Sequence, residues 1–375
     1  MDYFWQQVNF PDFQFEIADF ISQIQEFAKE FGEVNGLLVN VTEENKKSIL
    51  LHILVSEAIK TSEIEGVYFS REDIMSSLQH QLGIAEVSYT SKDKKAQAIS
   101  ELMWQVRKDY QKPFSLEMLK QWHTTLMRFD KTVNEGVWRS SAEPMQIISG
   151  RAGNIEVHFE APPSDVLPQL MNDFEQWYHS FQYHDLGTTG RAMLRAALVH
   201  LYFETLHPFE DGNGRIGRAL AEKALSETLE TPIFISLSKK IEENKQAYYE
   251  HLKQAQRKQE VTEWLCYFFF VIKEAQKEVK ETVRFVVEKA VFFDRYSHQL
   301  NERQSKVLRK MTDKGKFGFE GGMTSKKYMS ITKTSKATAT RDLQFLHEIG
   351  ALTREGEGRG VKYHLNWIIK KDFVL

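Results

Sequence analysis

Twelve consecutive residues, His207–Arg218, contain side chains and a backbone pattern suited to holding phosphate groups. Gly212–Gly214 can turn successive backbone N–H groups toward one point and so form an anion-binding nest. A helix predicted to begin near Gly214 would add the positive end of its dipole at the same point. Arg215 and Arg218 are three positions apart, so both guanidinium groups are predicted to reach one face and grip phosphate oxygens.

The same run also holds an acid and an imidazole. Asp211 offers a hard oxygen ligand beside the nest, which is how proteins commonly hold Mg²⁺ against phosphates. His207, with an ordinary pKa near 6.5, is suited to act as a general base toward an attacking hydroxyl. The alternative is an ordinary loop between helices, followed by two solvated arginines. The coincidence of imidazole, acid, nest and two arginines favours an active site that binds a nucleoside triphosphate.

The run His-Pro-Phe-Glu-Asp-Gly-Asn-Gly-Arg-Ile-Gly-Arg resembles the signature of Fic-domain proteins, His-Pro-Phe-x-(Asp/Glu)-Gly-Asn-Gly-Arg-x-x-Arg, at every fixed position. The resemblance extends over roughly residues 135–252. It implies a helical Fic fold, ATP and Mg²⁺ as the reactants bound, and protein AMPylation. In that reaction AMP passes from ATP to a Ser, Thr or Tyr hydroxyl of a target protein or of the enzyme itself, and pyrophosphate is released.

The resemblance also implies a role for each matching residue. His207 would deprotonate the target hydroxyl, Asp211 would hold Mg²⁺ against the α- and β-phosphates, and Arg218 would hold the γ-phosphate. The residues implied to contact the nucleotide are Val157, His158, Phe159 and Glu160 of a predicted flap, Gly212, Asn213, Gly214, Arg215, Ile216, Gly217 and Arg218 of the motif, and Tyr248 and Tyr249 near the adenine. Gln256 stands where some relatives carry an adenine-contacting asparagine. Core packing is the alternative for the tyrosines, and an ordinary surface hairpin is the alternative for the flap.

A second pattern, Thr61-Ser62-Glu63-Ile64-Glu65-Gly66, resembles the inhibitory motif of the family, (Ser/Thr)-x-x-x-Glu-(Gly/Asn). Thr61 and Glu65 share a helix face, and the Glu65 carboxylate would pair with Arg218 through two hydrogen bonds. The pair would place negative charge where the γ-phosphate of ATP should sit. The alternatives are an exposed acid at a helix end, or Glu57 in the inhibitory role. In some relatives the inhibitory glutamate helps to remove AMP, and this reverse reaction stays open.

The spacing of apolar residues predicts the elements that position these side chains. We expect helices over residues 45–65, 93–110, 115–127, 165–181, 190–206 and 214–229, and further helices to about residue 290. Two β-prone runs, 146–148 and 155–159, flank a Gly/Asn turn and predict a hairpin that acts as a flap. Gly66 is expected to follow the end of the first helix. The predicted fold class is therefore mainly α.

Residues 301–375 differ in charge from the rest of the chain. They carry 16 Lys and Arg against 8 Asp and Glu, although the whole chain has a net charge of −3. Helices expected at 305–310, 325–329 and 336–349, with strands at 351–354 and 361–365, resemble a winged helix-turn-helix domain. The basic residues placed to contact DNA are Lys333, Lys336, Arg341, Arg354, Arg359 and Lys362. The alternative is a protein-binding winged helix whose charges only aid solubility.

We therefore expect an N-terminal extension with the inhibitory helix (residues 1–90), a Fic catalytic domain (91–290) and a winged-helix domain (291–375). The single cysteine, Cys266, lies in an apolar run, so a buried and inert thiol is expected. The sequence shows no signal peptide and no apolar stretch long enough to span a bilayer, which predicts a cytoplasmic protein.

Other readings stay open beside protein AMPylation. Self-association is frequent in the family, which makes a homodimer plausible. One alternative function is a DNA-binding regulator whose Fic core senses ATP. Another is transfer from a different donor, such as CDP-choline or UTP, because the arginines bind phosphates and do not read the base.

Overall fold

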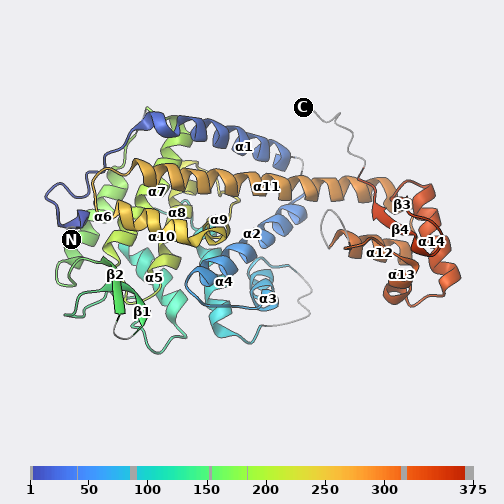
Figure 1. The fold of residues 1–375 in the computed structure, drawn as a ribbon, viewed down its shortest axis with the longest axis horizontal. Helices are drawn as coiled ribbons and strands as arrows, with labels where there is room; N and C mark the ends of the chain where they lie inside the picture. Colours follow the sequence, from blue (N-terminus) through green and yellow to red (C-terminus); the bar gives the residue numbers. More distant parts are fainter. Residues whose placement is uncertain are drawn as a thin grey trace. The chain divides into compact units, whose positions relative to one another are not determined.

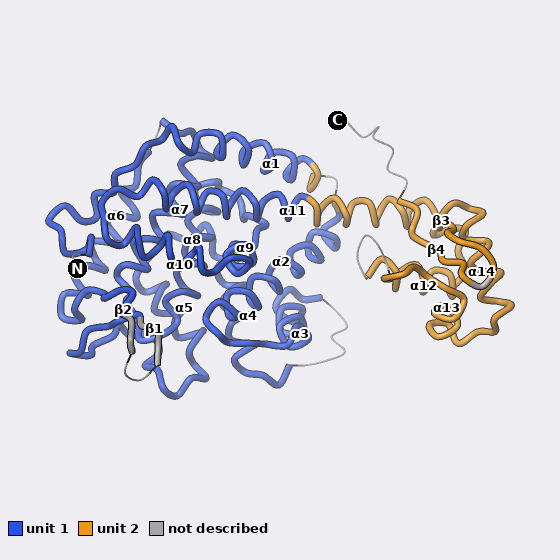
Figure 2. Tube along the Cα trace, viewed as in Figure 1, with its two compact units in different colours: residues 1–36, 42–280 blue, residues 37–41, 281–375 orange. Residues whose placement is uncertain are grey.

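The computed structural model describes residues 3–39, 41–84, 91–151, 154–183, 185–313 and 319–367. These residues are mainly helical, with two short antiparallel sheets (Figure 1), which confirms the predicted fold class. The chain divides into two compact units, residues 1–36 with 42–280 and residues 37–41 with 281–375 (Figure 2). Within the described ranges, none of the helices is both long enough and apolar enough to cross a bilayer.

The first unit holds the predicted site. Its elements, including helices α1 and α11 that continue into the second unit, are α1 (Ile21–Val39), α2 (Glu43–Ile64), α3 (Arg71–Gln81), α4 (Lys94–Lys108), α5 (Leu116–Met127), β1 (Gln146–Arg151), β2 (Asn154–Glu160), α6 (Leu167–Ser180), α7 (Gly187–Leu206), α8 (Asn213–Thr228), α9 (Leu237–Glu243), α10 (Lys245–Ala255) and α11 (Thr262–Tyr296). Two helices of this unit, α1 and α3, were not predicted from the sequence. In α1, Phe27 and Val34 are seven positions apart and both buried, so this helix packs one face against the unit.

Helix α8 is the central element of the first unit. It packs along α7 and also contacts α2, α4, α5 and α9. Both α7 and α8 are buried along most of their length. Helix α8 does not follow the rule that a buried helix is apolar on nearly all sides, because it buries Arg218, Glu222 and Lys223. Gly217 lets the two helices approach closely, because a side chain at that position would overlap the carboxylate of Glu204. The loop that joins α7 to α8 is therefore anchored at both ends in the core.

The predicted hairpin is present. Strands β1 and β2 pair antiparallel, with Gln146 opposite Glu160 at the open end, and the predicted turn residues 152–153 lie outside the described part of the chain. Phe159 is buried, and its ring meets that of Tyr3 edge-on at 5.1 Å. The N-terminal segment therefore supports the flap.

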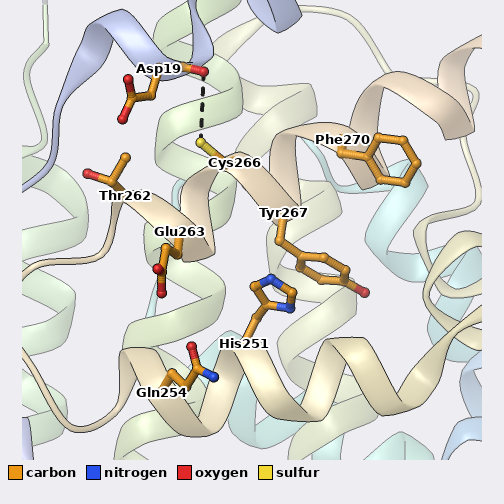
Figure 3. Close-up of a pocket in the computed structure, with 8 residues that line it drawn as sticks. All are labelled: Asp19, His251, Gln254, Thr262, Glu263, Cys266, Tyr267 and Phe270. Atoms are coloured by element: carbon orange, nitrogen blue, oxygen red, sulfur yellow. Dashed lines mark hydrogen bonds between the residues drawn. The ribbon is translucent and has the colours of Figure 1, made fainter.

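The prediction of a buried Cys266 is wrong. Trp264, Leu265 and Phe268 on the same helix are buried, but the helix turns Cys266 onto its outer face, where it is only half-buried. It lines a surface pocket of about 460 Å³ together with His251 (Figure 3). An apolar run on a helix alternates between faces every few residues, so membership of the run did not decide burial.

The second unit has a core of its own. Its elements beyond α11 are α12 (Glu302–Thr312), α13 (Ser325–Thr332), α14 (Lys336–Glu348), β3 (Leu352–Glu355) and β4 (Lys362–Leu365). Leu308, Leu343 and Leu352 are buried in that core. The buried Asp342 carboxylate accepts a hydrogen bond from Tyr328 Oη at 2.8 Å. The order of three helices and a hairpin follows the expected spans, and the winged-helix assignment stays a prediction. The side chain of Arg359 lies outside the described part.

Candidate active site

His207 is the residue at which helix α7 ends. Its backbone is left-handed, with φ 46° and ψ 58°, which is uncommon for a residue other than glycine. The buried Arg139 guanidinium holds this turn: Nε donates to the His207 carbonyl at 2.8 Å, and Nη2 donates to the Pro162 carbonyl at 2.6 Å. The backbone of this turn is thus held by an arginine 68 residues earlier, to which the sequence pattern gave no separate role.

Asn213 closes the loop on itself. Its side-chain Oδ1 accepts from the Phe209 N–H at 2.9 Å, and its Nδ2 donates to the Phe209 carbonyl at 2.8 Å. Gly212 has φ 82° and precedes the first residue of α8. The Asn213 amide is therefore used for loop structure, and what this turn offers to an anion is the main-chain N–H groups of the first turn of α8, which have no partners within the helix.

His123 on α5 packs against the loop that contains Phe209 and Asp211. The sequence did not predict this role for His123. Its ring stacks on Phe209 with centroids 3.9 Å apart. Its Nδ1 accepts from the Gly136 N–H at 2.8 Å, so its Nε2 carries the hydrogen and donates to the Asp211 carbonyl at 3.1 Å. Burial lowers the pKa of His123 to about 4, which keeps this ring neutral and its tautomer fixed.

Asp211 is the exposed acid of the loop. Its side chain is 56% exposed, and Oδ1 accepts from Arg215 Nη2 at 3.2 Å. Across the described residues, no group of three or more His, Cys, Asp and Glu side chains is arranged to hold a metal ion. A single exposed carboxylate beside an anion nest suits Mg²⁺ that takes most of its ligands from phosphates and water.

Arg218 is almost completely buried, with 1% of its surface exposed. Nε donates to Thr61 Oγ1 and Nη2 donates to the Thr61 carbonyl, both at 2.9 Å. Nη2 also donates to Glu65 Oε1 at 2.7 Å. The predicted two-bond pairing with Glu65 is thus replaced by a single hydrogen bond: Nε and Nη2 also donate to Thr61, and Nη1 is buried with no hydrogen-bond partner among the described residues. Arg215 and Arg218 bind different protein partners: Arg215 bonds to Asp211, whereas Arg218 bonds to Thr61 and Glu65.

Glu65 is positioned by the way helix α2 ends. Gly66 has φ 76°, and its N–H and that of Val67 donate back to the carbonyls of Glu63 and Ser62, a Schellman motif that confirms the predicted glycine stop. Oε1 of Glu65 lies so close to Gly214 that a Cβ at that position would overlap it. The carboxylate therefore occupies the space over the first turn of α8.

Two side chains of α10 also reach the end of α2. Lys245 Nζ and Tyr249 Oη both donate to the Ile64 carbonyl, each at 3.4 Å.

Glu57, the rival for the inhibitory role, has other partners. Its buried carboxylate accepts from Ser236 Oγ at 2.8 Å and from the N–H and the hydroxyl of Ser238.

A cavity of about 750 Å³ opens beside the loop and the end of α2. The predicted site residues that line it are Glu65, His158, Phe159, His207, Gly214, Tyr248 and Tyr249. Val157 and Glu160 belong to the flap but are absent from this lining, and Ile216 and Gly217 are packed between helices.

The two predicted adenine-site tyrosines differ in exposure. Tyr248 is buried, and its hydroxyl is bonded to His200 Nε2 at 2.9 Å, whereas Tyr249 is 41% exposed. Gln256 also lines the cavity, as does Glu204, which the sequence analysis did not assign.

Two buried groups at the cavity wall have strongly shifted pKa values. Burial, helped by the Arg139 charge, lowers the pKa of His207 to about 4, while the Glu65 charge acts in the opposite direction. Burial raises the pKa of Glu204 to about 8, although Arg218 opposes this shift. Both groups are therefore neutral near pH 7, and His207 is an unprotonated imidazole that can accept a proton.

A sequence comparison supports this reading of the loop. Residues 113–225, which run from α5 into α8, match the model of the Fic/DOC family. The chain carries a Fic domain. Residues 3–84 match a second model, described as a domain of unknown function (DUF4172). The His207 loop, Arg218 and the flap all fall within the Fic domain, whereas Glu65 falls in the segment that precedes it.

Curated relatives match about a quarter of this chain. A probable protein adenylyltransferase of Aquifex aeolicus is 28% identical over 95 residues, which are 25% of this chain and 28% of that protein. The protein adenylyltransferase Fic of Aedes aegypti is 33% identical over 101 residues, or 26% of this chain and 18% of that protein. The match thus spans less than a third of either relative.

Solved structures share the fold over more of the chain. A Fic family protein from Desulfovibrio desulfuricans superposes with a TM-score of 0.54 at 19% identity and covers 93% of this chain and 97% of that one. A Fic domain containing signaling protein from Bacteroides thetaiotaomicron gives a TM-score of 0.52 at 16% identity, over 69% of this chain and 97% of that one. These likenesses establish a Fic fold.

Proposed function

We propose that this chain is a protein adenylyltransferase that moves AMP from ATP to a Ser, Thr or Tyr hydroxyl of a target protein and of itself. The observation that carries the proposal is the placement of a neutral His207 at the wall of a cavity, beside the open N-terminal turn of α8 and the buried Arg218. Two relatives that match about a quarter of this chain are named as adenylyltransferases, and residues 113–225, which hold His207 and Arg218, match the Fic/DOC family.

In this reaction the target oxygen attacks the α-phosphorus of ATP, and the bond from that phosphorus to the α–β bridging oxygen breaks. Pyrophosphate leaves with the electron pair, and the hydroxyl proton passes to His207. The N–H groups at the start of α8 bind phosphate oxygens, Arg215 and Arg218 neutralise their charge, and Asp211 is the residue that would hold Mg²⁺. A bound Mg²⁺ would supply neutralisation of charge on the phosphates.

We further propose that Glu65 inhibits this reaction. Its carboxylate is bonded to Arg218 at 2.7 Å and lies over Gly214, so it competes with a phosphate for both the guanidinium group and the helix terminus. An ATP molecule would have to displace it or bind with a misplaced triphosphate, and misplacement by about 1 Å can slow a transfer reaction by roughly a hundredfold.

Incubation of the Glu65→Gly variant with Mg²⁺ and ATP labelled at the α-phosphate tests the proposal. We expect label on the protein itself, and a mass gain of AMP on a Ser, Thr or Tyr of a lysate protein. Adding His207→Ala should lower transfer by at least a hundredfold, the scale of general base catalysis. Parallel reactions with UTP and CDP-choline test the donor. No label from any donor, in a variant that keeps its fold, would refute the proposal.

A second candidate function rests on residues 301–375, which carry 16 basic against 8 acidic side chains. Lys333 is exposed at the end of α13, and Lys336 and Arg341 are exposed on α14. These features favour binding to DNA phosphates. A gel shift on genomic DNA fragments, with Lys336→Glu and Arg341→Glu as controls and with or without ATP, tests it. Binding that neither variant weakens would contradict the assignment.

A further inference from the structure

Glu204 is a buried acid to which the proposed reaction gives no role. It lies one turn before His207 on α7, 4% of its surface is exposed, and it lines the cavity. Its Oε2 is 3.9 Å from Nδ1 of His207. Its other oxygen, Oε1, faces Gly217, where a Cβ would overlap it. One oxygen of the carboxyl group thus lies against Gly217 of α8, and the other lies near the imidazole of His207.

Two polar atoms are left without partners at this place. By geometry, neither Glu204 Oε1 nor His207 Nδ1 makes a hydrogen bond within the described residues, although both are buried. The main-chain carbonyl of Glu204 acts on the imidazole as well, since a bond to it contributes to raising the pKa of His207. Unpaired buried polar atoms are rare in native proteins, and each one calls for a reason. The second oxygen of the Glu204 carboxyl group, Oε2, is 3.9 Å from His207 Nδ1, and that distance needs to shorten by only about 1 Å to become a hydrogen bond. Catalytic hydrogen bonds are often long before the reactants bind.

We infer that Glu204 is a positioning residue for His207: its carboxyl group accepts the hydrogen on Nδ1 and so leaves Nε2 as the nitrogen that takes the proton of the target hydroxyl. The inference rests on the proposed function. An imidazole can serve as a base at one nitrogen only if the other carries the hydrogen, and the partner of that other nitrogen decides the tautomer. His123 shows the same principle in this protein, because the bonds to Gly136 and Asp211 fix its tautomer.

The charged and titratable groups around Glu204 come from several helices. They include His200 on α7, Arg218 on α8, Glu65 after α2, and Tyr248 and Tyr249 on α10. Burial raises the pKa of Glu204, Arg218 lowers it, and Glu65 raises it. A protonated carboxyl group still has an oxygen that accepts a hydrogen bond. The uncharged amide of glutamine should therefore replace Glu204 well, and a methionine of similar length should not.

The chain offers a matched control. Glu222 on α8 is also buried, and burial raises its pKa to about 8 as well. Its electrostatic partners are Glu57 and Arg107 rather than His207. If Glu204 acts only by filling space between helices, Glu204→Met and Glu222→Met should behave alike.

The experiment measures the tautomer of His207 by ¹⁵N NMR of histidine-labelled full-length protein, with His207→Gln to assign the signal. We expect the Nδ1–H tautomer in the unaltered chain, in Glu204→Gln and in Glu222→Met, and a shift toward Nε2–H in Glu204→Met. In the Glu65→Gly background, Glu204→Met should also lower kcat for AMP transfer at least tenfold and change KM for ATP less than threefold, while Glu204→Gln stays within threefold of the parent.

An unchanged tautomer in Glu204→Met would overturn the inference, as would equal losses of kcat in Glu204→Met and Glu222→Met. The NMR signal does not depend on AMP transfer. If no variant transfers AMP, the proposed function fails, and the tautomer still decides whether Glu204 orients His207.

Discussion

Helix α2 carries two glutamates whose surroundings differ sharply, one in its middle and one at its end. Glu57 is 4% exposed, and its carboxylate accepts hydrogen bonds from Ser236 and from Ser238. The side chain of Glu65 is 28% exposed and makes one hydrogen bond, to Arg218. Both acids lie near Arg218, since the charge of that arginine also lowers the pKa of Glu57.

The difference shows what separates a structural acid from a candidate switch. The groups that donate to Glu57 are neutral, and within the described part of the chain they make no other hydrogen bond. Removing Glu57 therefore leaves buried hydroxyl and N–H groups unpaired. Glu65 shares its arginine with Thr61, and it stands at a helix end where a phosphate with more charge can take its place. A carboxylate that can be exchanged for a ligand must be held firmly enough to compete and loosely enough to leave.

The largest effect expected from this comparison is on AMP transfer. Glu65→Gly should raise the rate at a fixed ATP concentration roughly ten- to a hundredfold, the factor that corresponds to about 1.5–3 kcal/mol for a hydrogen bond to a charged group. Glu57→Gln should not raise it. The measurement is label transfer from ATP at equal protein concentration. A rise in Glu57→Gln as large as that in Glu65→Gly would break the distinction between the two acids.

The next effect is on stability. Glu57→Gln places an amide NH₂ against the donors of Ser236 and Ser238, and it should lower the free energy of unfolding by about 1–3 kcal/mol. Glu65→Gln keeps the size of the side chain in a partly exposed place and should cost less. Denaturant unfolding of both variants decides between them. Equal losses would mean that the bond from Glu65 to Arg218 is as much a part of the fold as the Glu57 cluster.

What could be predicted from the sequence follows the same division between local and distant contacts. The His207–Arg218 loop was predictable, because its own residues shape it: Asn213 bonds Phe209 four positions earlier, and Gly212 takes the left-handed turn. The stop of α2 at Gly66 was predictable for the same reason.

The contacts that position the side chains and turns of the site join residues far apart in the chain. Arg218 is 157 positions from Thr61, and Arg139 is 68 positions from His207. No spacing rule reports such pairs, so Arg139, His123 and Glu204 were not assigned to the site. Glu65 was found only through the resemblance to a family motif. The predicted number of its bonds to Arg218 was wrong, because the packing of distant segments decides which nitrogen of the guanidinium group meets which partner.

A smaller effect is expected where α10 meets the end of α2. Lys245→Met removes one long hydrogen bond to the Ile64 carbonyl and should loosen the segment that carries Glu65. A bond of this kind contributes about 0.5–1 kcal/mol, so AMP transfer should rise roughly two- to fivefold. Lys253→Met is the control, because this lysine also lines the cavity but its ammonium group is bonded to His158. A rise in both variants would indicate a general effect of positive charge at the cavity.

The smallest effect expected is a change in the pKa of His207, and it tests the comparison without catalysis. Burial holds this pKa at about 4, and among the two acids only the charge of Glu65 contributes to raising it. Glu65→Gln removes that charge, so the charged imidazole loses stabilisation and its pKa should fall further, while Glu57→Gln should leave it unchanged. Titration of the His207 ring signal by NMR measures the shift.

Because His207 would then stay neutral from pH 6 to 8 in every variant, its protonation should cause no loss of AMP transfer in that range at saturating Mg²⁺. A loss centred near 6.5, the ordinary histidine value, would show that the imidazole is more exposed to water than its place at the end of α7 allows.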